Sequence, residues 1–277
     1  MLIRSLVLGI VDWETDLKMS ENEKLLSKEI DKLKKENATW IGEVRKSERV
    51  ISNVFSILDL KDLLPPELLR MHVGTTTSAV NFYAQGAGSS RAAISFFGPD
   101  PGGAVLDWGC GSGRTLNWLR LIPAWRDAYH GCDVDPEAIN WLTSQGVPRV
   151  KLCADDPPLD YEPNTFVGLF CFSVLTHIHP SRHKLWYDEI HRVLKPGGKA
   201  LITTQGQTVV NSGRVADPNV LESFRSQGWA HKKNEGHYKD AALVSRDYSV
   251  DLMKSTFANV EVVERGYNNM EAYVAYK

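Results

Sequence analysis

Residues 105–114, VLDWGCGSGR, constrain the fold more than any other part of this 277-residue chain. An apolar segment ends in Asp107 and leads directly into a turn with Gly109, Gly111 and Gly113. Glycine adopts positive φ without a steric cost and lets the backbone approach a ligand closely. The pattern therefore predicts a buried strand followed by a ligand-binding turn, as found at the carboxyl ends of strands in open α/β sheets.

The spacing of this turn disfavours a dinucleotide. The dinucleotide fingerprint is Gly-x-Gly-x-x-Gly, with a pyrophosphate at a helix N-terminus. Here the third glycine comes one residue earlier, and the carboxylate of Asp107 would repel a diphosphate. A carboxylate can instead accept hydrogen bonds from an amine. The turn thus suits a cationic, amine-bearing nucleoside without phosphates, and the candidate is S-adenosylmethionine (SAM).

Two further acidic positions follow predicted strands. A strand over residues 129–133 ends in Asp133, about 20 residues past the glycines, where an acid can take up ribose hydroxyls. A third strand over residues 150–153 leads to Asp155 and Asp156, which we expect beside an adenine amine. Asp155 is the better placed of the two.

The remaining segments complete the pattern of a mostly parallel sheet. Residues 166–172 are nearly all apolar, which is typical of a parallel strand covered on both faces. A predicted helix stopped by the Pro-Gly-Gly at 196–198 precedes a fifth strand. Residues 260–265 and 272–276 alternate in polarity and predict an antiparallel hairpin.

At this point the chain resembles the class I SAM-dependent methyltransferases, over roughly residues 70–277. The matching segments are VLDWGCGSGR, GCDVDPEAI, CADDPPL, FCFSVLTHI and EIHRVLKPGG followed by a strand. The resemblance implies a Rossmann-like α/β domain with a seven-stranded, mostly parallel sheet in the order 3-2-1-4-5-7-6. A narrower likeness, in SVLTHIH and ITTQG, is to bacterial methyltransferases associated with glycan and cell-envelope biosynthesis.

The segment before the glycine turn often folds over the cofactor in this family. Tyr83, Gln85 and Gly86 are therefore candidates to line the pocket, although they can equally pack a helix against the sheet. The residues that we expect to contact SAM are Tyr83, Asp107, Gly109, Cys110, Gly111, Gly113, Arg114, Asp133, Val134, Asp155, Asp156, Phe172 and Ser173.

The chemistry of SAM sets what the protein must supply. The methyl group sits on a sulfonium, so the protein mainly aligns the nucleophile with it. An oxygen nucleophile also needs a base. His177 follows the fourth strand together with Ser173 and Thr176 and is the leading candidate, with His179 next. The alternative is that His177 caps a helix or fills a structural role.

A long insertion follows the fifth strand. Residues 207–246 are rich in Gly, Ser, Asn, His and Lys, with one short helical patch near 219–226. Such a segment is typical of a lid over a substrate. His237 and Tyr238 lie in this predicted lid and are further catalytic candidates.

The N-terminal segment carries a different pattern. Hydrophobic residues recur in steps of four and three over residues 26–58, with Asn37 at an a position. This heptad seam favours a parallel two-stranded coiled coil and hence a homodimer. The alternative is a helix folded back on its own domain, because Trp40 and Ser47 suit a seam poorly. Met19 is an alternative initiator.

A Leu-Pro-Pro segment at 64–66 marks the predicted domain boundary. It divides the chain into a coiled-coil-like segment, 1–63, and a methyltransferase domain, 64–277.

Composition bears on the partners and the location of the protein. A net charge of −2 offers no global basic field for nucleic acid, and no apolar run reaches the ~18 residues of a membrane span. The four cysteines lie near the ends of four predicted strands and lack zinc or disulfide spacing, so we expect reduced thiols, no metal and a cytoplasmic protein.

The sequence therefore predicts transfer of a methyl group from SAM to a small-molecule or glycan acceptor, most readily on oxygen. Three alternatives remain: a catalytically silent SAM-binding scaffold recruited through the coiled coil, methylation of another small molecule or a protein on nitrogen, and aminopropyl transfer from decarboxylated SAM. The last would need acids after the fourth strand, where this chain offers Ser, Thr and His.

Overall fold

The computed structural model describes residues 32, 64–74, 77–233, 240–264, 267 and 269–277. The chain divides into two compact units, Met1–Leu58 and Asp59–Lys277, and the second holds nearly all of the described residues. The predicted coiled coil lies outside the described residues, apart from Lys32, and so do His237 and Tyr238.

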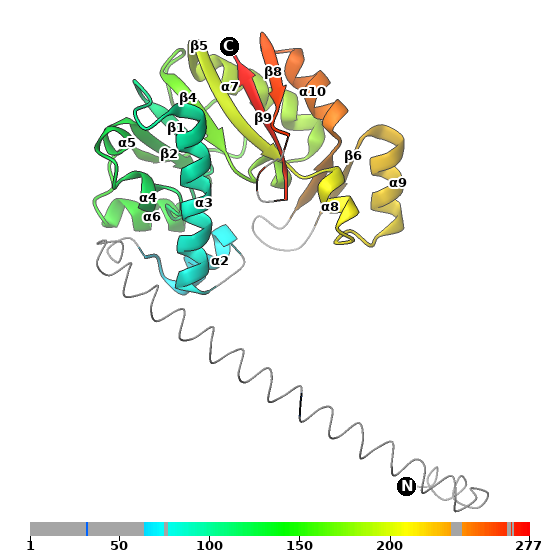
Figure 1. The fold of residues 1–277 in the computed structure, drawn as a ribbon, viewed down its shortest axis with the longest axis horizontal. Helices are drawn as coiled ribbons and strands as arrows, with labels where there is room; N and C mark the ends of the chain where they lie inside the picture. The colour runs from blue at the N-terminus through cyan, green and yellow to red at the C-terminus, as the bar shows by residue number, and fades with distance from the viewer. Residues whose placement is uncertain (1–31, 33–63, 75–76, 234–239, 265–266, 268) are drawn as a thin grey trace, which may run out of the picture. The chain divides into compact units, whose positions relative to one another are not determined.

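A seven-stranded sheet forms the centre of the second unit (Figure 1). Its strands are β1 (Val105–Trp108), β2 (Tyr129–Asp133), β3 (Val150–Leu152), β4 (Phe166–Cys171), β5 (Leu194–Thr204), β8 (Asn259–Val262) and β9 (Glu271–Tyr276). They are arranged β3-β2-β1-β4-β5-β9-β8; the first five pair in parallel, and β9 is antiparallel to both neighbours. Counted within this sheet alone, the order is 3-2-1-4-5-7-6, so the predicted topology is confirmed.

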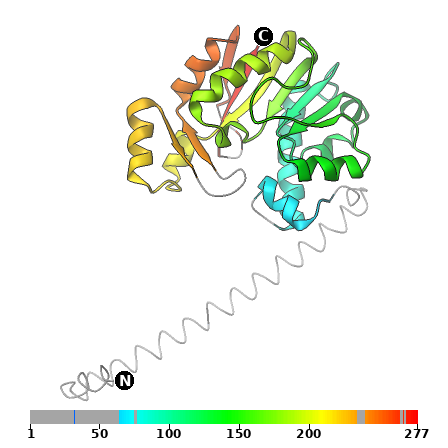
Figure 2. The ribbon, with the colours of Figure 1, turned by 180° about the vertical axis from the view of Figure 1, so that it is seen from behind.

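Helices cover both faces of the sheet, because alternate residues of each strand point to opposite sides. On one face, Leu169 and Cys171 of β4 belong to a hydrophobic core that includes residues of α7 (His183–Val193) and α10 (Arg246–Lys254). On the other face, Phe170 packs in a second core with residues of α3 (Ala79–Phe97) and α6 (Pro136–Ser144). Helix α3 is in front of the sheet in Figure 1, whereas α7 comes to the front in the reverse view of Figure 2.

Local signals explain where several helices begin. The side chain of Asp135 accepts hydrogen bonds from the backbone N–H groups of Glu137 and Ala138, and Pro136 occupies the first turn of α6. Ser78 caps α3 in the same way. Two short helices, α4 (Leu116–Leu119) and α5 (Pro123–Ala128), follow the glycine turn, and α2 (Glu67–Gly74) precedes α3.

The insertion after β5 has more regular structure than the sequence predicted. Instead of one helical patch, the described part contains α8 (Gln207–Asn211), α9 (Pro218–Gln227) and an antiparallel hairpin of β6 (Trp229–Lys232) and β7 (Ala241–Val244). Val209, Phe224, Ala230 and Leu243 form a small core of their own. Strands this short give too little periodicity to be detected in a sequence, which is why the hairpin was missed.

One helix boundary differs from the prediction. The helix predicted to stop at Pro-Gly-Gly ends earlier, at Val193, because Leu194 already pairs with Phe166 as the start of β5.

All four cysteines are free thiols, and Cys153 is the one that is not fully buried. Within the described residues no helix is long and apolar enough to cross a membrane.

Candidate functional site

The glycine turn after β1 has the backbone that the sequence predicted. Gly109, Gly111 and Gly113 have φ values of 83°, 51° and 82°. The N–H groups of Gly109 and Cys110 both donate to the carbonyl of Cys132, at 2.8 and 3.1 Å, which ties the turn to β2. A Cβ atom on Gly111 would lie 2.2 Å from a methyl carbon of Val73, and one on Gly109 would lie as close to Val174. Side chains are thus excluded at both positions.

Asp133 is fixed at the edge of this turn. Its carboxylate accepts hydrogen bonds from the backbone N–H of Gly111 at 2.6 Å and from that of Asp135 at 2.9 Å. Burial raises the pKa of Asp133, whereas the two backbone hydrogen bonds act in the opposite direction. Val134, also a predicted cofactor contact, is the half-buried residue that follows. The end of β2 therefore presents an oriented carboxylate to the glycine turn, at the position predicted for a ribose-binding acid.

Asp107 lies deeper than the sequence suggested, with only 3% of its surface exposed. The hydroxyl of Tyr129 donates to its Oδ2 at 2.8 Å. Burial raises the pKa of Asp107 to about 7 against the lowering effect of that hydrogen bond. One carboxylate oxygen is thus already engaged by a tyrosine that the sequence analysis did not single out, and the predicted contact with an amine stays a prediction.

Arg114 joins the glycine turn to the two helices that precede β1. Its Nη1 donates to the carbonyl of Val73 and to the Oε1 of Gln85, each at 2.5 Å. Helix α3 packs closely here: a Cβ on Gly86 would lie 2.3 Å from the carbonyl of Arg114, and the carbonyl of Tyr83 accepts from a tryptophan indole of α4. The structure thus shows the packing role for Gly86 and Tyr83, and their contact with a cofactor stays a prediction.

Helix α2 packs against the glycine turn through contacts that were not predicted from the sequence. The hydroxyl of Ser112 donates to the carbonyl of Leu69 at 3.3 Å. The Nδ1 of His72 lies 2.7 Å from the carboxylate of Asp135, which also caps α6. Together with the side chain of Val73 over Gly111, these contacts place α2 against the predicted cofactor site.

The acids after β3 lie at the surface. Asp155 and Asp156 are both exposed. The guanidinium of Arg182 donates to the carbonyl of Asp155 and pairs with the carboxylate of Asp156. Because Arg182 comes from the short 3₁₀ helix η3 (Pro180–Arg182), the segments after β3 and β4 are joined at this edge.

A residue close to the C-terminal end of the chain packs against the segment that follows β4. Phe172 is nearly buried, and its ring packs on that of Tyr267 with centroids 4.6 Å apart. Ser173 adopts a positive φ of 67°, its N–H donates to the hydroxyl of Thr203, and its own hydroxyl contacts the sulfur of Met270. Tyr267 lies between β8 and β9, and nothing in the sequence signalled that it would contact Phe172.

His177 ends the 3₁₀ helix η2 (Leu175–His177) that follows β4. Its Nδ1 lies 3.0 Å from the backbone carbonyl of Asp240. A carbonyl only accepts, so Nδ1 carries the proton and Nε2 keeps its lone pair. Burial lowers the pKa of His177, which favours the neutral ring. The hydroxyl of neighbouring Thr176 donates to the carbonyl of Ser173, so it serves the turn itself.

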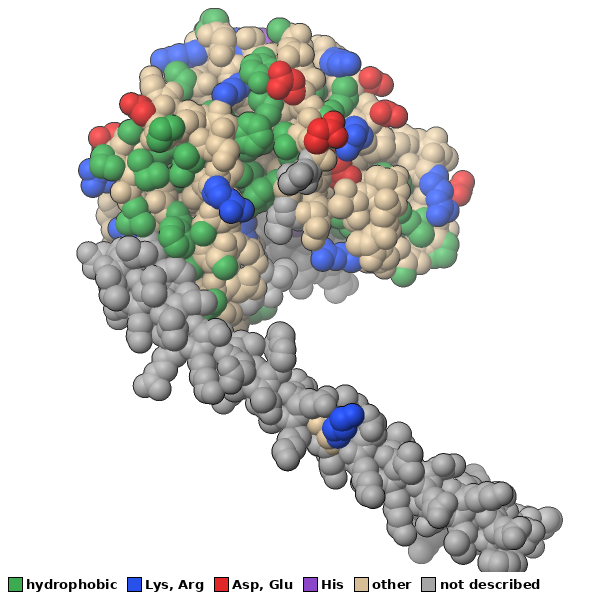
Figure 3. All heavy atoms as spheres, viewed as in Figure 1, with side chains coloured by type: hydrophobic (Ala, Val, Ile, Leu, Met, Phe, Trp, Pro, Cys, Tyr) green, Lys and Arg blue, Asp and Glu red, His purple; other side chains and the backbone are tan. Residues whose placement is uncertain are grey.

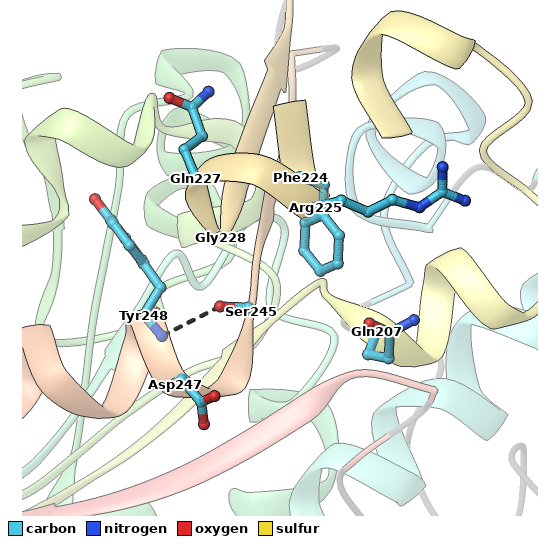
Figure 4. A pocket seen from close by; sticks show the side chains of 8 residues that line it. All are labelled: Gln207, Phe224, Arg225, Gln227, Gly228, Ser245, Asp247 and Tyr248. Atoms are coloured by element: carbon cyan, nitrogen blue, oxygen red, sulfur yellow. Dashed lines mark hydrogen bonds between the residues drawn. The ribbon is translucent and has the colours of Figure 1, made fainter. Parts of the chain in front are cut away.

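A separate hollow of about 550 Å³ opens among α8, α9 and α10 (Figure 4). The side chains drawn there include Phe224, Arg225 and Tyr248, and the N–H of Tyr248 donates to the hydroxyl of Ser245 at the start of α10. Its lining contains none of the residues predicted to bind SAM. On the face shown in Figure 3, Lys and Arg side chains are scattered among acidic and apolar ones and form no continuous basic stripe among the described residues.

Comparison with known proteins relates the central part of the chain to a protein family. Residues 106–202, which run from β1 to β5, match the protein family described as "Methyltransferase domain". This stretch, about a third of the chain, is therefore similar to methyltransferase domains. Two curated relatives are a tRNA (carboxymethyluridine(34)-5-O)-methyltransferase of Arabidopsis thaliana, 34% identical over 37% of this chain, and a malonyl-[acyl-carrier protein] O-methyltransferase of Herminiimonas arsenicoxydans, 33% identical over 38% of this chain.

The chain spans only 24% and 38% of the lengths of these two relatives. Among solved structures, a protein from Pyrococcus horikoshii covers 71% of this chain and 91% of its own with a TM-score of 0.51, at 16% identity. That likeness shows the fold. The family match over residues 106–202, together with a Rossmann-like sheet of the predicted order, supports SAM as the cofactor of this chain.

The residues present also fit this cofactor. The glycine turn excludes side chains, and an oriented carboxylate stands at its edge on Asp133. A second carboxylate, on Asp107, lies beneath the turn, where a cationic amine would favour its ionised form. A site of this composition suits a nucleoside with a positive charge better than one with phosphates.

Proposed function

We propose that this chain transfers a methyl group from SAM to an oxygen atom of a small-molecule or sugar acceptor. The observation that carries the proposal is the pairing of the glycine turn with Asp133, whose carboxylate lies 2.6 Å from the N–H of Gly111. The names of both curated relatives given above specify O-methylation, which favours oxygen as the acceptor atom. A phosphoethanolamine N-methyltransferase of Caenorhabditis elegans, 28% identical over 60% of this chain, favours nitrogen instead, so amines belong in the test below. The narrower likeness to glycan-modifying enzymes makes a sugar hydroxyl the first acceptor to test.

In this proposal the cofactor supplies an activated methyl group, and the residues of the chain hold the reactants and move the proton. Asp133 binds the ribose hydroxyls, and Asp107 favours a positive charge above the glycine turn. His177 accepts the proton of the acceptor hydroxyl at Nε2, because its Nδ1 proton is engaged by the carbonyl of Asp240. The acceptor enters at the carboxyl ends of β4 and β5, where open α/β sheets bind their ligands.

His179 is a weaker candidate for the base. Its Nδ1 accepts from the backbone N–H of Ser181 at 3.2 Å and so caps η3. The lone pair of that ring is therefore already used in holding the turn. We further propose that the enzyme acts in the cytoplasm as a homodimer paired through the heptads of residues 26–58.

The proposal is tested with the full chain, SAM and a panel of sugars, nucleotide sugars, phenols and amines, with S-adenosylhomocysteine formation as the readout. We expect turnover with a hydroxyl acceptor. His177→Ala should slow it by about 10²–10⁴-fold, the usual contribution of a general base, with unchanged affinity for S-adenosylhomocysteine. His191→Ala, on α7 and packed against Phe257, is the matched control. Turnover of amines alone, or unchanged turnover in His177→Ala, would contradict the proposal.

A further inference from the structure

A cluster of ring and carboxylate groups lies where the β6–β7 hairpin meets the turns after β4. We refer to His179, His231 and Asp240 as the hairpin cluster. The rings of His179 and His231 approach edge to face with centroids 4.6 Å apart. The Nε2 of His231 lies 3.2 Å from the Oδ2 of Asp240. The backbone carbonyl of the same Asp240 faces the Nδ1 of His177. A continuous set of contacts thus links the hairpin to the proposed base.

We propose that His231 is a positioning residue for His177, and that it acts by holding Asp240 in place. This inference rests on the base role proposed for His177 above. His231 fixes the side chain of Asp240, the carbonyl of Asp240 fixes the proton of His177 on Nδ1, and Nε2 of His177 is thereby left to accept a proton from the acceptor. The β6–β7 hairpin then helps to determine which ring nitrogen of His177 carries the proton.

Asp240 is held in place from two sides, by the β6–β7 ladder and by His231. Asp240 directly precedes β7, whose first residue, Ala241, pairs with Lys232 at the end of β6. The ladder therefore anchors one side of Asp240, and the contact with His231 anchors its side chain. The His231 side chain is only 14% exposed, and His179 packs against it, so its ring has little freedom to move away from Asp240.

The proton of a histidine ring does not sit on Nδ1 by default. A neutral imidazole in water prefers the proton on Nε2, and a hydrogen-bond partner selects which nitrogen keeps it. A hydroxyl acceptor approaching Nε2 requires the less common form, with the proton on Nδ1. Loss of the carbonyl contact would return His177 toward the form in which Nε2 is already protonated, and a base of that kind cannot accept a proton there.

The test reads the tautomer of His177 directly and needs no acceptor. The full chain is labelled with ¹⁵N at histidine and studied by long-range ¹H–¹⁵N NMR at pH 8, with His177→Ala used to assign the signals. Wild type should show His177 protonated at Nδ1. His231→Leu should move His177 toward protonation at Nε2, whereas His231→Gln should preserve the wild-type form, because its polar amide can keep a contact with the Asp240 carboxylate.

Lys232→Leu is the matched control, since it changes the exposed next residue of the same strand. Far-ultraviolet circular dichroism checks that each variant is folded. The inference is overturned if folded His231→Leu keeps the wild-type tautomer, or if His231→Gln loses it as fully as His231→Leu does. Neither outcome depends on SAM binding or methyl transfer, so a failure of this inference is distinguishable from a failure of the proposed function.

Discussion

Replacing Asp107 with asparagine tests whether the buried acid beneath the glycine turn weakens the fold when it ionises. Its pKa is raised from 3.8 to about 7, chiefly by burial. Between these two values the folded chain holds a proton that the unfolded chain has lost. Stability due to this group is therefore greatest near pH 4, falls as the pH rises toward 7, and is constant above that.

The magnitude follows from the size of the shift. A rise of about 3 pKa units at about 1.4 kcal/mol per unit gives roughly 4 kcal/mol as an upper limit for the cost of the ionised form. An asparagine side chain at this position would keep an oxygen that can accept from Tyr129 but would carry no charge. From pH 4.5 to the folded pKa of about 7 the window is roughly 2.5 units, so we expect Asp107→Asn to gain up to about 3 kcal/mol in free energy of unfolding, relative to wild type, between pH 4.5 and pH 8.

The assay is urea unfolding of both proteins without cofactor at pH 4.5 and pH 8, followed by tryptophan fluorescence. Asp127→Asn changes an exposed acid on α5 and serves as the control, with the same small effect at both pH values. If Asp107→Asn changes the free energy of unfolding equally at the two pH values, the buried acid is ionised throughout and the reasoning fails.

Three further predictions concern other parts of the chain. Gly111→Ala should lose cofactor affinity and about 2 kcal/mol or more of stability, because its Cβ would lie 2.2 Å from Val73 at a positive φ. Gly146→Ala, also at positive φ but with open space around it, should cost only about 1–2 kcal/mol of backbone strain. Thermal melts measure the stabilities of both variants, and calorimetry measures their cofactor affinities. Because burial lowers the pKa of His177, the methyl-transfer rate should hold to a lower pH than an ordinary histidine would allow, and a loss of rate already above pH 7 would argue against it. Deleting residues 1–60 should give a monomer by light scattering, and a persistent dimer would place the interface on residues 64–277.

The strand order was predictable because its signals are local. Apolar runs that end in an acid or a glycine mark the parallel strands, and alternation marks the closing hairpin. Residues 129–133 were predicted as a strand and form β2 with the same bounds. Parallel strands are joined by right-handed crossovers, such as the one through the helix after Asp133. This rule leaves few alternative strand orders for a mostly parallel sheet.

The contacts within the site were not predictable, because they depend on register between strands. Val105 pairs with Tyr129, and Asp107 pairs with Gly131. A Cβ on Gly131 would lie 3.2 Å from the hydroxyl of Tyr129, so the glycine leaves room for that hydroxyl to reach Asp107. Nothing in the sequence of either strand alone states this register.

The contributions of distant segments were missed for the same reason. Tyr267 reaches Phe172, and Asp240 reaches His177, although both pairs are far apart in the sequence. The contact between His231 and Asp240 was missed because the short hairpin strands could not be detected from the sequence. Spacing rules cover helices and adjacent strands, but not loops brought together by the fold.

Titration calorimetry of the full chain with S-adenosylhomocysteine shows whether the glycine turn belongs to a SAM site. We expect saturable binding to wild type and to the control Asp127→Ala. Asp133→Ala should bind at least about tenfold more weakly, because hydrogen bonds to a charged carboxylate contribute about 1.5–3 kcal/mol. Absence of binding to wild type, or equal affinity in Asp133→Ala, would contradict a SAM site at the glycine turn.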